Sequence, residues 1–355
     1  MKQAVSIVGV LVGWGFGLAV VGVTPEVHAA EAEVTTLPET PARGVVVSCY
    51  RWGPGEWDNP ATMPPLLDEL KALGVTAIQV HPYARIGRDG TVGYRPGPVR
   101  PATLRPLEWA KERGLSTFLK PHLAYWGSGF AWRGVITFDT EAQWDRFFRG
   151  YTEFIVDQAR LAERADADVF AVGTELHQTL HREADWRRVV AAVREVYGGS
   201  LTYAANWDEH PDVPFWDALD LVGVQAYYPV TEALPPTDAD LRAGWADIAG
   251  RLRALSAKHG KPVLLTELGY AQSEEAALQP WSDARIGDPA TGAELKLRCM
   301  RIALETLAAP GNQTHIAGVF LWKWFPGDRD HADEFVLQYD AMRSVIRDAW
   351  RPGRR

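Results

Sequence analysis

Short runs of apolar, mostly β-branched residues alternate with longer amphipathic stretches from Gly44 almost to the end of the 355-residue chain. Short apolar runs between turn residues predict buried strands, and apolar residues spaced three and four apart predict helices. Because strands joined by crossover helices run parallel, this alternation predicts an α/β fold. Eight such units favour closure into a single (β/α)8 TIM barrel. An open doubly wound sheet is the alternative, but no G-x-G-x-x-G motif follows the first strand.

The boundaries of the elements follow from the same pattern. We expect strands at residues 45–47, 75–80, 115–120, 168–173, 201–205, 221–226, 263–266 and 317–322. We expect helices at 64–73, 104–113, 184–197, 238–259 and 294–308, and another after Thr140, which has the capping-box spacing to Gln143. Glycines at 74, 114 and 260 predict left-handed helix caps. The connection 208–219 has room only for a helical turn.

The N-terminal residues have the composition of a targeting segment. Lys2 precedes an apolar run at 4–23, and Val27-His28-Ala29 resembles a cleavage site, so residues 1–29 predict a secretory signal peptide. An uncleaved membrane anchor is the alternative, because about 20 apolar residues can span a bilayer. We therefore expect an exported protein, extracellular or periplasmic. Its predicted parts after the signal peptide are a linker at 30–43, the barrel domain at 44–350 and a tail at 351–355.

The composition excludes several classes of protein. The formal net charge is −8, and the only basic cluster is three arginines within 350–355, which argues against nucleic-acid binding. Two cysteines, Cys49 and Cys299, exclude a small disulfide-stapled fold and leave open whether they pair. The 15 tryptophans are roughly three times the usual share. This fits either a large aromatic core or a cleft whose flat aromatic faces bind sugars.

The ends of the predicted strands are nearly all polar or aromatic. In a barrel of this class the active site lies at the carboxyl ends of the strands, so these side chains are the candidate site. They are Trp52, His81, Lys120, His122, Glu175, Asn206, Trp207, Tyr227, Tyr228, Glu267, Trp322 and Trp324. Several have a purely structural alternative: the histidines and Asn206 as satisfied buried polar groups, Lys120 as a counter-ion, and one of the two strand-eight tryptophans as packing.

Glu175 and Glu267 are the most informative of these residues, because each directly follows an apolar strand. A carboxylate at the end of a buried strand is costly unless it is paired or used. Two carboxylates facing each other across a barrel mouth form the pair that glycoside hydrolysis needs. A salt-bridged structural role is the alternative.

The chain resembles the glycoside hydrolases of clan A, and among them family 113, known for β-mannanases. The segments that carry the resemblance are Leu119-Lys120-Pro121-His122, Val172-Gly173-Thr174-Glu175, Gly223-Val224-Gln225-Ala226-Tyr227-Tyr228-Pro229, Thr266-Glu267-Leu268-Gly269 and Leu321-Trp322. The resemblance extends from about Gly44 to Trp350. It implies that Glu175 is the acid/base and Glu267 the nucleophile. One departure is Thr174, where many clan members have an asparagine that holds the sugar 2-hydroxyl.

The resemblance implies a retaining endo-β-1,4-mannanase that uses double displacement, and the two carboxyl groups are then expected about 5–5.5 Å apart. This chemistry needs only carboxylates, so we expect no metal and no cofactor. A tyrosine on strand six, Tyr228 rather than Tyr227, is expected to donate to Glu267, and Trp322 to lie under the reacting sugar. We expect a monomer that acts on a polysaccharide or oligosaccharide.

Other functions remain as alternatives. The same barrel could cleave another β-glycan, such as β-glucan, xylan or a β-mannoside, or could bind carbohydrate without catalysis. A metal hydrolase is suggested by the i, i+4 spacing of His177 and His181, but the chain has no H-x-H after strand one and no H-E-x-x-H. A serine hydrolase is disfavoured because no G-x-S-x-G occurs.

Overall fold

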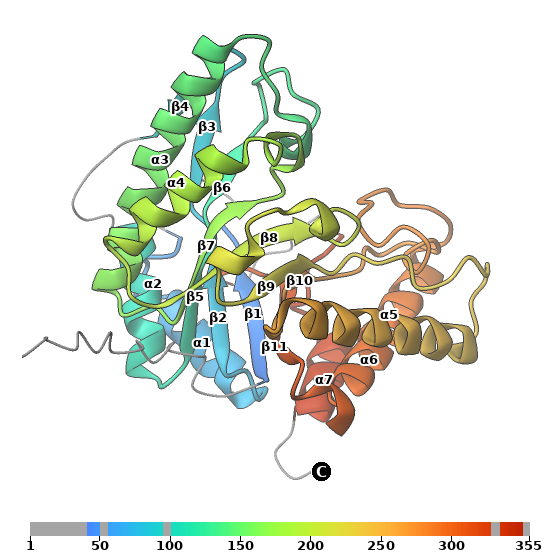
Figure 1. Cartoon of the computed structure of the whole chain (residues 1–355). Coiled ribbons are helices and arrows are strands. Elements are labelled where there is room, and N and C mark those ends of the chain that lie inside the picture. Colours follow the sequence, from blue (N-terminus) through green and yellow to red (C-terminus); the bar gives the residue numbers. More distant parts are fainter. Residues whose placement is uncertain (1–40, 50–55, 95–100, 328–333, 351–355) are drawn as a thin grey trace, which may run out of the picture. The chain divides into compact units, whose positions relative to one another are not determined.

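The computed structural model describes residues 41–49, 56–94, 101–327 and 334–350. Eight parallel strands close into a barrel, because the first strand pairs with both the second and the last (Figure 1). In chain order they are β1 (Ala42–Val47), β2 (Ala77–Val80), β5 (Ser116–Leu119), β7 (Val169–Thr174), β8 (Ser200–Asn206), β9 (Val222–Gln225), β10 (Val263–Leu268) and β11 (Ile316–Trp324). The predicted barrel is confirmed, and all eight strands lie where the apolar runs placed them.

Helices surround the strands of the barrel (Figure 1). They are α1 (Met63–Ala72), α2 (Pro101–Glu112), α3 (Glu141–Arg164), α4 (Glu183–Arg194), α5 (Asp238–His259), α6 (Pro289–Leu307) and α7 (Asp340–Trp350). Between β8 and β9 there are only two short 3-10 turns, η3 (His210–Asp212) and η4 (Trp216–Ala218), as the short connection predicts. The helix α7 was not predicted.

The local signals at the helix ends are confirmed. The Thr140 side chain accepts from the backbone amide of Gln143, and Gln143 reaches back to the Thr140 amide, which makes a complete capping box. The glycines that follow α1, α2 and α5 have φ values of 93°, 70° and 63°, in the left-handed region that favours glycine. Only three or four residues therefore separate each of these helices from the next barrel strand.

The core has two layers. Side chains from the strands, together with Leu221 directly before β9, form the inner cluster, where the ring of Phe118 packs edge-on against that of Phe320 at 5.2 Å. A Cβ atom on Gly44 would lie 2.3 Å from the Phe320 ring, so only glycine fits at this position of β1. The other faces of the strands and the inner faces of the helices form a larger apolar layer outside the barrel. This packing fixes the strand ends on which the site is built.

A small second sheet was not predicted. It consists of β3 (Tyr83–Ile86), β4 (Val92–Gly93) and β6 (His122–Ala124), in the order β4-β3-β6. β3 and β6 follow β2 and β5 by only a few residues and pair in parallel, so the second and third barrel strands are extended beyond the barrel. Their segments are too short and too mixed in polarity to give a strand signal. They raise one wall of the barrel mouth.

The predicted targeting segment 1–29 and most of the linker lie outside the described residues, and β1 begins at Ala42, within the predicted linker. Among the described residues, no helix combines the length and apolar character that a membrane span needs. Cys49 and Cys299 are both free thiols. Burial raises the pKa of each thiol to about 12, so both are protonated at neutral pH.

Candidate active site

Glu175 directly follows β7 in an unusual backbone conformation. Its φ is +53°, in the left-handed region that non-glycine residues rarely adopt. Two contacts with β8 hold this turn: the Glu175 amide donates to the carbonyl of Ala204 at 2.9 Å, and the Leu176 amide donates to the hydroxyl of Tyr203 at 2.7 Å. Strain of this kind persists only where surrounding structure enforces it, and it clusters at functional sites.

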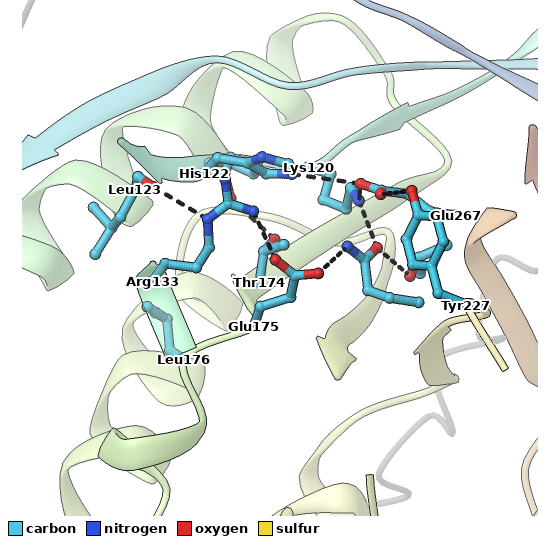
Figure 2. A network of polar contacts seen from close by, with 12 residues as sticks. Lys120, His122, Leu123, Arg133, Thr174, Glu175, Leu176, Tyr227 and Glu267 are labelled. Atoms are coloured by element: carbon cyan, nitrogen blue, oxygen red, sulfur yellow. Dashed lines mark hydrogen bonds and ion pairs between the residues drawn. The ribbon is translucent and has the colours of Figure 1, made fainter. Parts of the chain in front are cut away.

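Glu267 lies within β10 and is almost fully buried, with 3% of its surface exposed. The Tyr227 hydroxyl donates to its Oε2 at 2.6 Å, and the Lys120 ammonium contacts its Oε1 (Figure 2). Register shifts occur beside Glu267 in β10 and just before Glu175 in β7. Bulges of this kind redirect side chains at strand ends, which is why they are frequent next to active sites.

A single amide, that of Gln225 in β9, joins the two glutamates. Its Oε1 accepts from Lys120 Nζ at 2.8 Å and from Thr266 Oγ1 at 3.0 Å. These two donors fix the orientation of the amide, so its Nε2 must face the other way, and it donates to Glu175 Oε1 at 2.9 Å. The network therefore runs continuously from Glu267 through Lys120 and Gln225 to Glu175.

Arg133 completes the network from the other side. It lies in the 3-10 turn η1 (Arg133–Val135), and its Nη1 donates to Glu175 Oε2 at 2.8 Å (Figure 2). Burial opposes the charged form of Arg133, but Glu175, Tyr83 and Glu267 together outweigh burial and raise the pKa of the guanidinium. Arg133 was not predicted as a site residue, because it stands in a long connection without periodicity. Gln225 was not predicted either, since its only signal is that it is a polar residue in an otherwise apolar strand.

Both glutamates open onto a cleft of about 1230 Å³ at the carboxyl ends of the strands. Tryptophan rings line it: Trp322 packs beside the His81 ring at 5.3 Å, and Trp126 and Trp281 are large exposed aromatics. Trp281 stacks on Trp207 with centroids 5.8 Å apart and an interplanar angle of 17°. The cleft thus offers flat apolar faces together with paired carboxylates.

The structure brings most of the predicted site residues together. His122, Asn206, Trp207, Tyr227 and Trp322 line the cleft with the two glutamates, and Lys120 contacts Glu267. His81 is buried against His122, with ring centroids 5.1 Å apart. Trp52 lies outside the described residues.

Four of the predicted residues in the described part of the chain do not line the cleft: His81 and Lys120, which lie directly behind it, and Tyr228 and Trp324. Tyr228 is buried and packs against Trp207 and Arg251, so the favoured candidate for the donor to Glu267 was wrong and Tyr227 is the donor. Trp324 is fully buried, with the Arg343 guanidinium 5.6 Å from its ring. The β1–β11 register explains this: Val45 faces Leu321 but Val47 faces Trp324, so one extra residue in β11 reverses the alternation after Trp322.

The two histidines beside the carboxylates are neutral. Burial, reinforced by the nearby charges of Lys120 and Arg133, holds the pKa of His81 and of His122 well below the usual value. Neither ring has a hydrogen-bond partner among the described residues. His122 lies at the cleft, with its Nε2 4.0 Å from Glu267 Oε1, so its nitrogens are available to a ligand.

A third glutamate lies at the cleft. Burial and the negative charges of Asp208 and Glu175 raise the pKa of Glu209 to about 8. At neutral pH Glu209 is therefore mostly a neutral carboxylic acid. Among the described residues, no group of three or more histidine, cysteine, aspartate or glutamate side chains is arranged to hold a metal ion, so His177 and His181 do not form such a site.

The chain is similar to known proteins both in sequence and in fold. The sequence model of Glycoside Hydrolase Family 113 matches residues 54–335. A solved complex of a family 113 β-1,4-mannanase is 21% identical with a TM-score of 0.74, covering 88% of this chain and 100% of its own. The family 113 β-mannanase AaManA from Alicyclobacillus acidocaldarius, in complex with ManMIm, is 23% identical with a TM-score of 0.74, covering 88% and 98%.

A more distant neighbour is the endo-β-1,4-mannanase from Thermotoga petrophila, at 12% identity and a TM-score of 0.57, covering 89% of this chain and 77% of that one. A comparison with curated protein sequences found no match. At these identities the solved structures show a shared fold, and the family model connects the sequence itself to a known group of enzymes.

Proposed function

The chain belongs to Glycoside Hydrolase Family 113, and we propose that it is a retaining endo-β-1,4-mannanase with Glu267 as nucleophile and Glu175 as acid/base. The observation that carries this proposal is the pair of glutamates in one cleft, linked through Gln225 and Lys120. The fold class explains why they meet: both end parallel strands of one barrel, so both reach the same mouth.

In the first step Glu267 attacks the anomeric carbon of a bound β-mannosyl unit. The bond from this carbon to the glycosidic oxygen breaks, and the leaving oxygen takes a proton from Glu175. Lys120 and the Tyr227 hydroxyl, which contact different oxygens of Glu267, fix the orientation of its carboxyl group. The assignment of Glu267, rather than Glu175, as the nucleophile rests on the family resemblance, because each of the two glutamates has a cation on one oxygen and a hydrogen-bond donor on the other.

In the second step the mannosyl–Glu267 ester is hydrolysed. Glu175, now a carboxylate, takes a proton from a water molecule as this water attacks the anomeric carbon. The ester bond breaks, Glu267 returns as a carboxylate, and the product keeps the β-configuration. Glu175 is protonated again and is ready for the next substrate.

A polymeric substrate is supported by the aromatic residues of the cleft. Trp126 and Trp281 expose 47% and 48% of their surfaces at a cleft that Trp322 also lines. Exposed rings of this size bind sugar rings through their flat faces. Rings at separate places along the cleft suit a chain that extends past the reacting unit, as internal cleavage requires. The solved neighbours named above as mannanases favour β-1,4-mannan as this chain.

The proposal also includes export of the protein from the cytoplasm. An extracellular polysaccharide cannot enter a cell, and residues 1–29 have the pattern of a signal peptide or anchor. We propose that the protein is a monomer acting outside the cytoplasm. Mass spectrometry of the protein from its native host tests the export step: a mature N-terminus near residue 30 in the culture fluid or periplasm supports it.

The enzyme is tested by incubating the purified chain with β-mannan, β-glucan, xylan and aryl glycosides, and sizing the products. A ladder of manno-oligosaccharides supports an endo-mannanase, and monosaccharide alone contradicts internal cleavage. Glu267→Gln is the matched inactive variant, and Glu305→Ala removes an exposed carboxylate of α6 as control. Glycan binding without turnover in the wild type would identify a non-catalytic binder.

A further inference from the structure

We propose that His122 binds the 2-hydroxyl of the reacting sugar, the contact that many clan members make with the asparagine before the acid/base. The inference rests on the proposed function and deepens it, because it names a contact to the sugar that Glu267 attacks. In this chain the residue before the acid/base is Thr174, so the 2-hydroxyl needs another partner. Hydrogen bonds to this hydroxyl strengthen in the transition state of glycoside hydrolysis, which makes the contact important for rate.

Thr174 does not offer its hydroxyl to the cleft. Its side chain is buried, and its Oγ1 donates to the backbone carbonyl of Pro121 at 3.2 Å. Among the described residues that line the cleft, Thr174 is not included. Position 174 therefore provides no substitute for the asparagine.

Other polar groups around Glu267 already have protein partners. The Lys120 ammonium contacts Oε1 of Glu267, and the Tyr227 hydroxyl donates to Oε2 at 2.6 Å. Asn206 lines the cleft at the end of β8, and its side chain is hydrogen-bonded to Glu209. A contact to the 2-hydroxyl from any of these groups would have to compete with an existing hydrogen bond.

The imidazole of His122 differs from these groups. It lines the cleft with only 2% of the residue exposed, and neither ring nitrogen has a hydrogen-bond partner among the described residues. Buried polar groups in folded proteins are nearly always hydrogen-bonded, so this ring calls for a partner from the cleft. Its Nε2 lies 4.0 Å from Glu267 Oε1, which is too far for a hydrogen bond between the two (Figure 2).

The 4.0 Å separation between Nε2 and Oε1 suits one bridging oxygen atom. An oxygen at a hydrogen-bond distance of about 2.8–3.0 Å from each atom fits between them. Glu267, as the nucleophile, is a carboxylate that only accepts, so the bridging group must donate to Oε1 and accept from Nε2. A sugar hydroxyl does both at once, whereas an ether oxygen has no proton to donate.

The position of the attack selects the hydroxyl. Glu267 attacks the anomeric carbon, whose ring neighbours are the ring oxygen and C2. The ring oxygen carries no proton, and the hydroxyls on C3, C4 and C6 are farther from the reaction centre. The 2-hydroxyl is therefore the sugar group that meets both Glu267 and His122.

The packing around His122 holds the ring in place. The ring stacks on that of His81 with centroids 5.1 Å apart and meets Tyr83 edge-on at 5.3 Å, and the His122 amide donates to the Pro82 carbonyl at 2.8 Å. Burial, reinforced by nearby positive charges, holds the pKa of His122 well below its usual value. The ring is then neutral, with one N–H and one acceptor nitrogen, and the contact requires the proton on Nε2.

The test measures how His122 and the 2-hydroxyl depend on each other. The substrates are 2,4-dinitrophenyl β-mannobioside and two analogues in which the sugar that carries the aryl group lacks its 2-hydroxyl or its 6-hydroxyl. We expect His122→Leu to lower kcat/KM about tenfold or more on the parent substrate, because a hydrogen bond made in the transition state is lost. On the 2-deoxy analogue the same substitution should change kcat/KM by no more than about two- to threefold, since the contact is already missing.

The 6-deoxy analogue should show the full loss in His122→Leu. Each loss is a ratio between two proteins on one substrate, so the intrinsic reactivity of the deoxy sugar cancels. An equal loss on the parent and 2-deoxy substrates would overturn the inference. A loss that disappears on the 6-deoxy analogue instead would also overturn it, because His122 would then bind a different hydroxyl.

Two further variants complete the kinetic test. His122→Gln restores a donor near the position of Nε2 and should recover part of the loss on the parent substrate but not on the 2-deoxy analogue. His181→Leu is the matched control, because His181 is exposed outside the cleft and its Nδ1 lies 2.9 Å from the Gln178 carbonyl. It should leave kcat/KM unchanged on all three substrates, and a selective loss on the parent substrate in His181→Leu would contradict the role of His122.

A crystal structure gives a test without any change at His122. In Glu175→Gln soaked with mannotriose, the 2-hydroxyl oxygen of the sugar beside Glu267 should lie within about 3.2 Å of both His122 Nε2 and Glu267 Oε1. A different hydroxyl at this place, or none, would overturn the inference. If the wild type cleaves no β-glycan, the proposed function fails and this inference fails with it. If mannan is cleaved but the loss does not depend on the 2-hydroxyl, only the role of His122 fails.

Discussion

The ammonium of Lys120 contacts Oε1 of Glu267 at a place where the two side chains expose only 0% and 5% of their surfaces. Burial lowers the pKa of Lys120, and the Glu267 carboxylate opposes this effect. Gln225 and Tyr227 supply the remaining hydrogen bonds, so the buried charges are paired and largely satisfied. The pair fixes the proposed nucleophile before any substrate arrives.

We expect Lys120→Met to lower the free energy of unfolding by about 3–5 kcal/mol, because it leaves a buried carboxylate without its cation. The double variant Lys120→Met/Glu267→Gln should recover much of this loss, since both charges are gone. Urea unfolding of the wild type, Lys120→Met and the double variant measures the effect. Arg242→Met, which breaks the exposed pair with Glu305, should cost no more than about 1 kcal/mol. If Lys120→Met and Arg242→Met lowered the free energy of unfolding by the same amount, burial of the Lys120–Glu267 pair would not explain the loss.

We expect Glu267→Ala to abolish turnover on every substrate, because no glycosyl-enzyme can form. Glu175→Ala should lose at least about 10²–10⁴-fold on mannan but retain the first step on an activated aryl glycoside. Added azide should then restore turnover of Glu175→Ala and give a β-glycosyl azide, identified by NMR. If azide instead gave a glycosyl azide of retained configuration with Glu267→Ala, the roles of Glu175 and Glu267 would have to be exchanged.

Tyr227 and Tyr228 form a matched pair of adjacent tyrosines. Tyr227→Phe removes the 2.6 Å hydrogen bond to Glu267 Oε2, and hydrogen bonds to charged groups contribute about 1.5–3 kcal/mol. We therefore expect kcat to fall by about tenfold or more. Tyr228→Phe keeps the ring that packs on Trp207 and should change kcat by no more than about two- to threefold. A larger effect of Tyr228→Phe would contradict the structure.

Glu209 gives a pH-dependent stability. Its pKa is about 8 in the folded protein against a usual value of 4.5, so the folded state holds this proton over a range where the unfolded state has lost it. The unfolded state therefore binds fewer protons between pH 4.5 and 8, and stability falls as pH rises through this window. Glu209→Gln removes the effect. The free energy of unfolding of Glu209→Gln, measured with urea, should exceed that of the wild type by more at pH 8 than at pH 5.

Trp281 tests whether the substrate extends along the cleft. We expect Trp281→Ala to raise KM for mannan about tenfold, a loss of roughly 1.4 kcal/mol of binding. KM for a short aryl mannoside should stay unchanged, because in the proposed function Trp281 binds a sugar beyond the reacting unit. Equal losses on both substrates would indicate a general disturbance of the loop. Trp281→Phe keeps an aromatic face and should recover part of the affinity.

The alternation of apolar runs and amphipathic stretches was enough to predict the barrel and its eight strands. Periodicity is a local property, and helix caps such as Thr140 and Gly260 act within one turn of the chain. The positions of Glu175 and Glu267 also follow from the sequence, because parallel strands of one barrel all end at one mouth. These features need no knowledge of how distant segments pack.

The direction of each side chain at the mouth was decided by tertiary structure. Beyond the end of β9 the Tyr227 amide donates to the Gln225 carbonyl at 3.0 Å, and Tyr227 rather than the predicted Tyr228 reaches Glu267. In β11 one extra residue separates Trp322 from Trp324. Such a bulge depends on how β11 pairs with β1, which no local pattern encodes. Likewise Arg133 lies 42 residues before Glu175 in an irregular connection, and only the folding of that loop over the barrel brings the guanidinium to the carboxylate. The sequence alone determined the strands and the two carboxylates, and three-dimensional packing alone determined which charges and hydrogen bonds surround them.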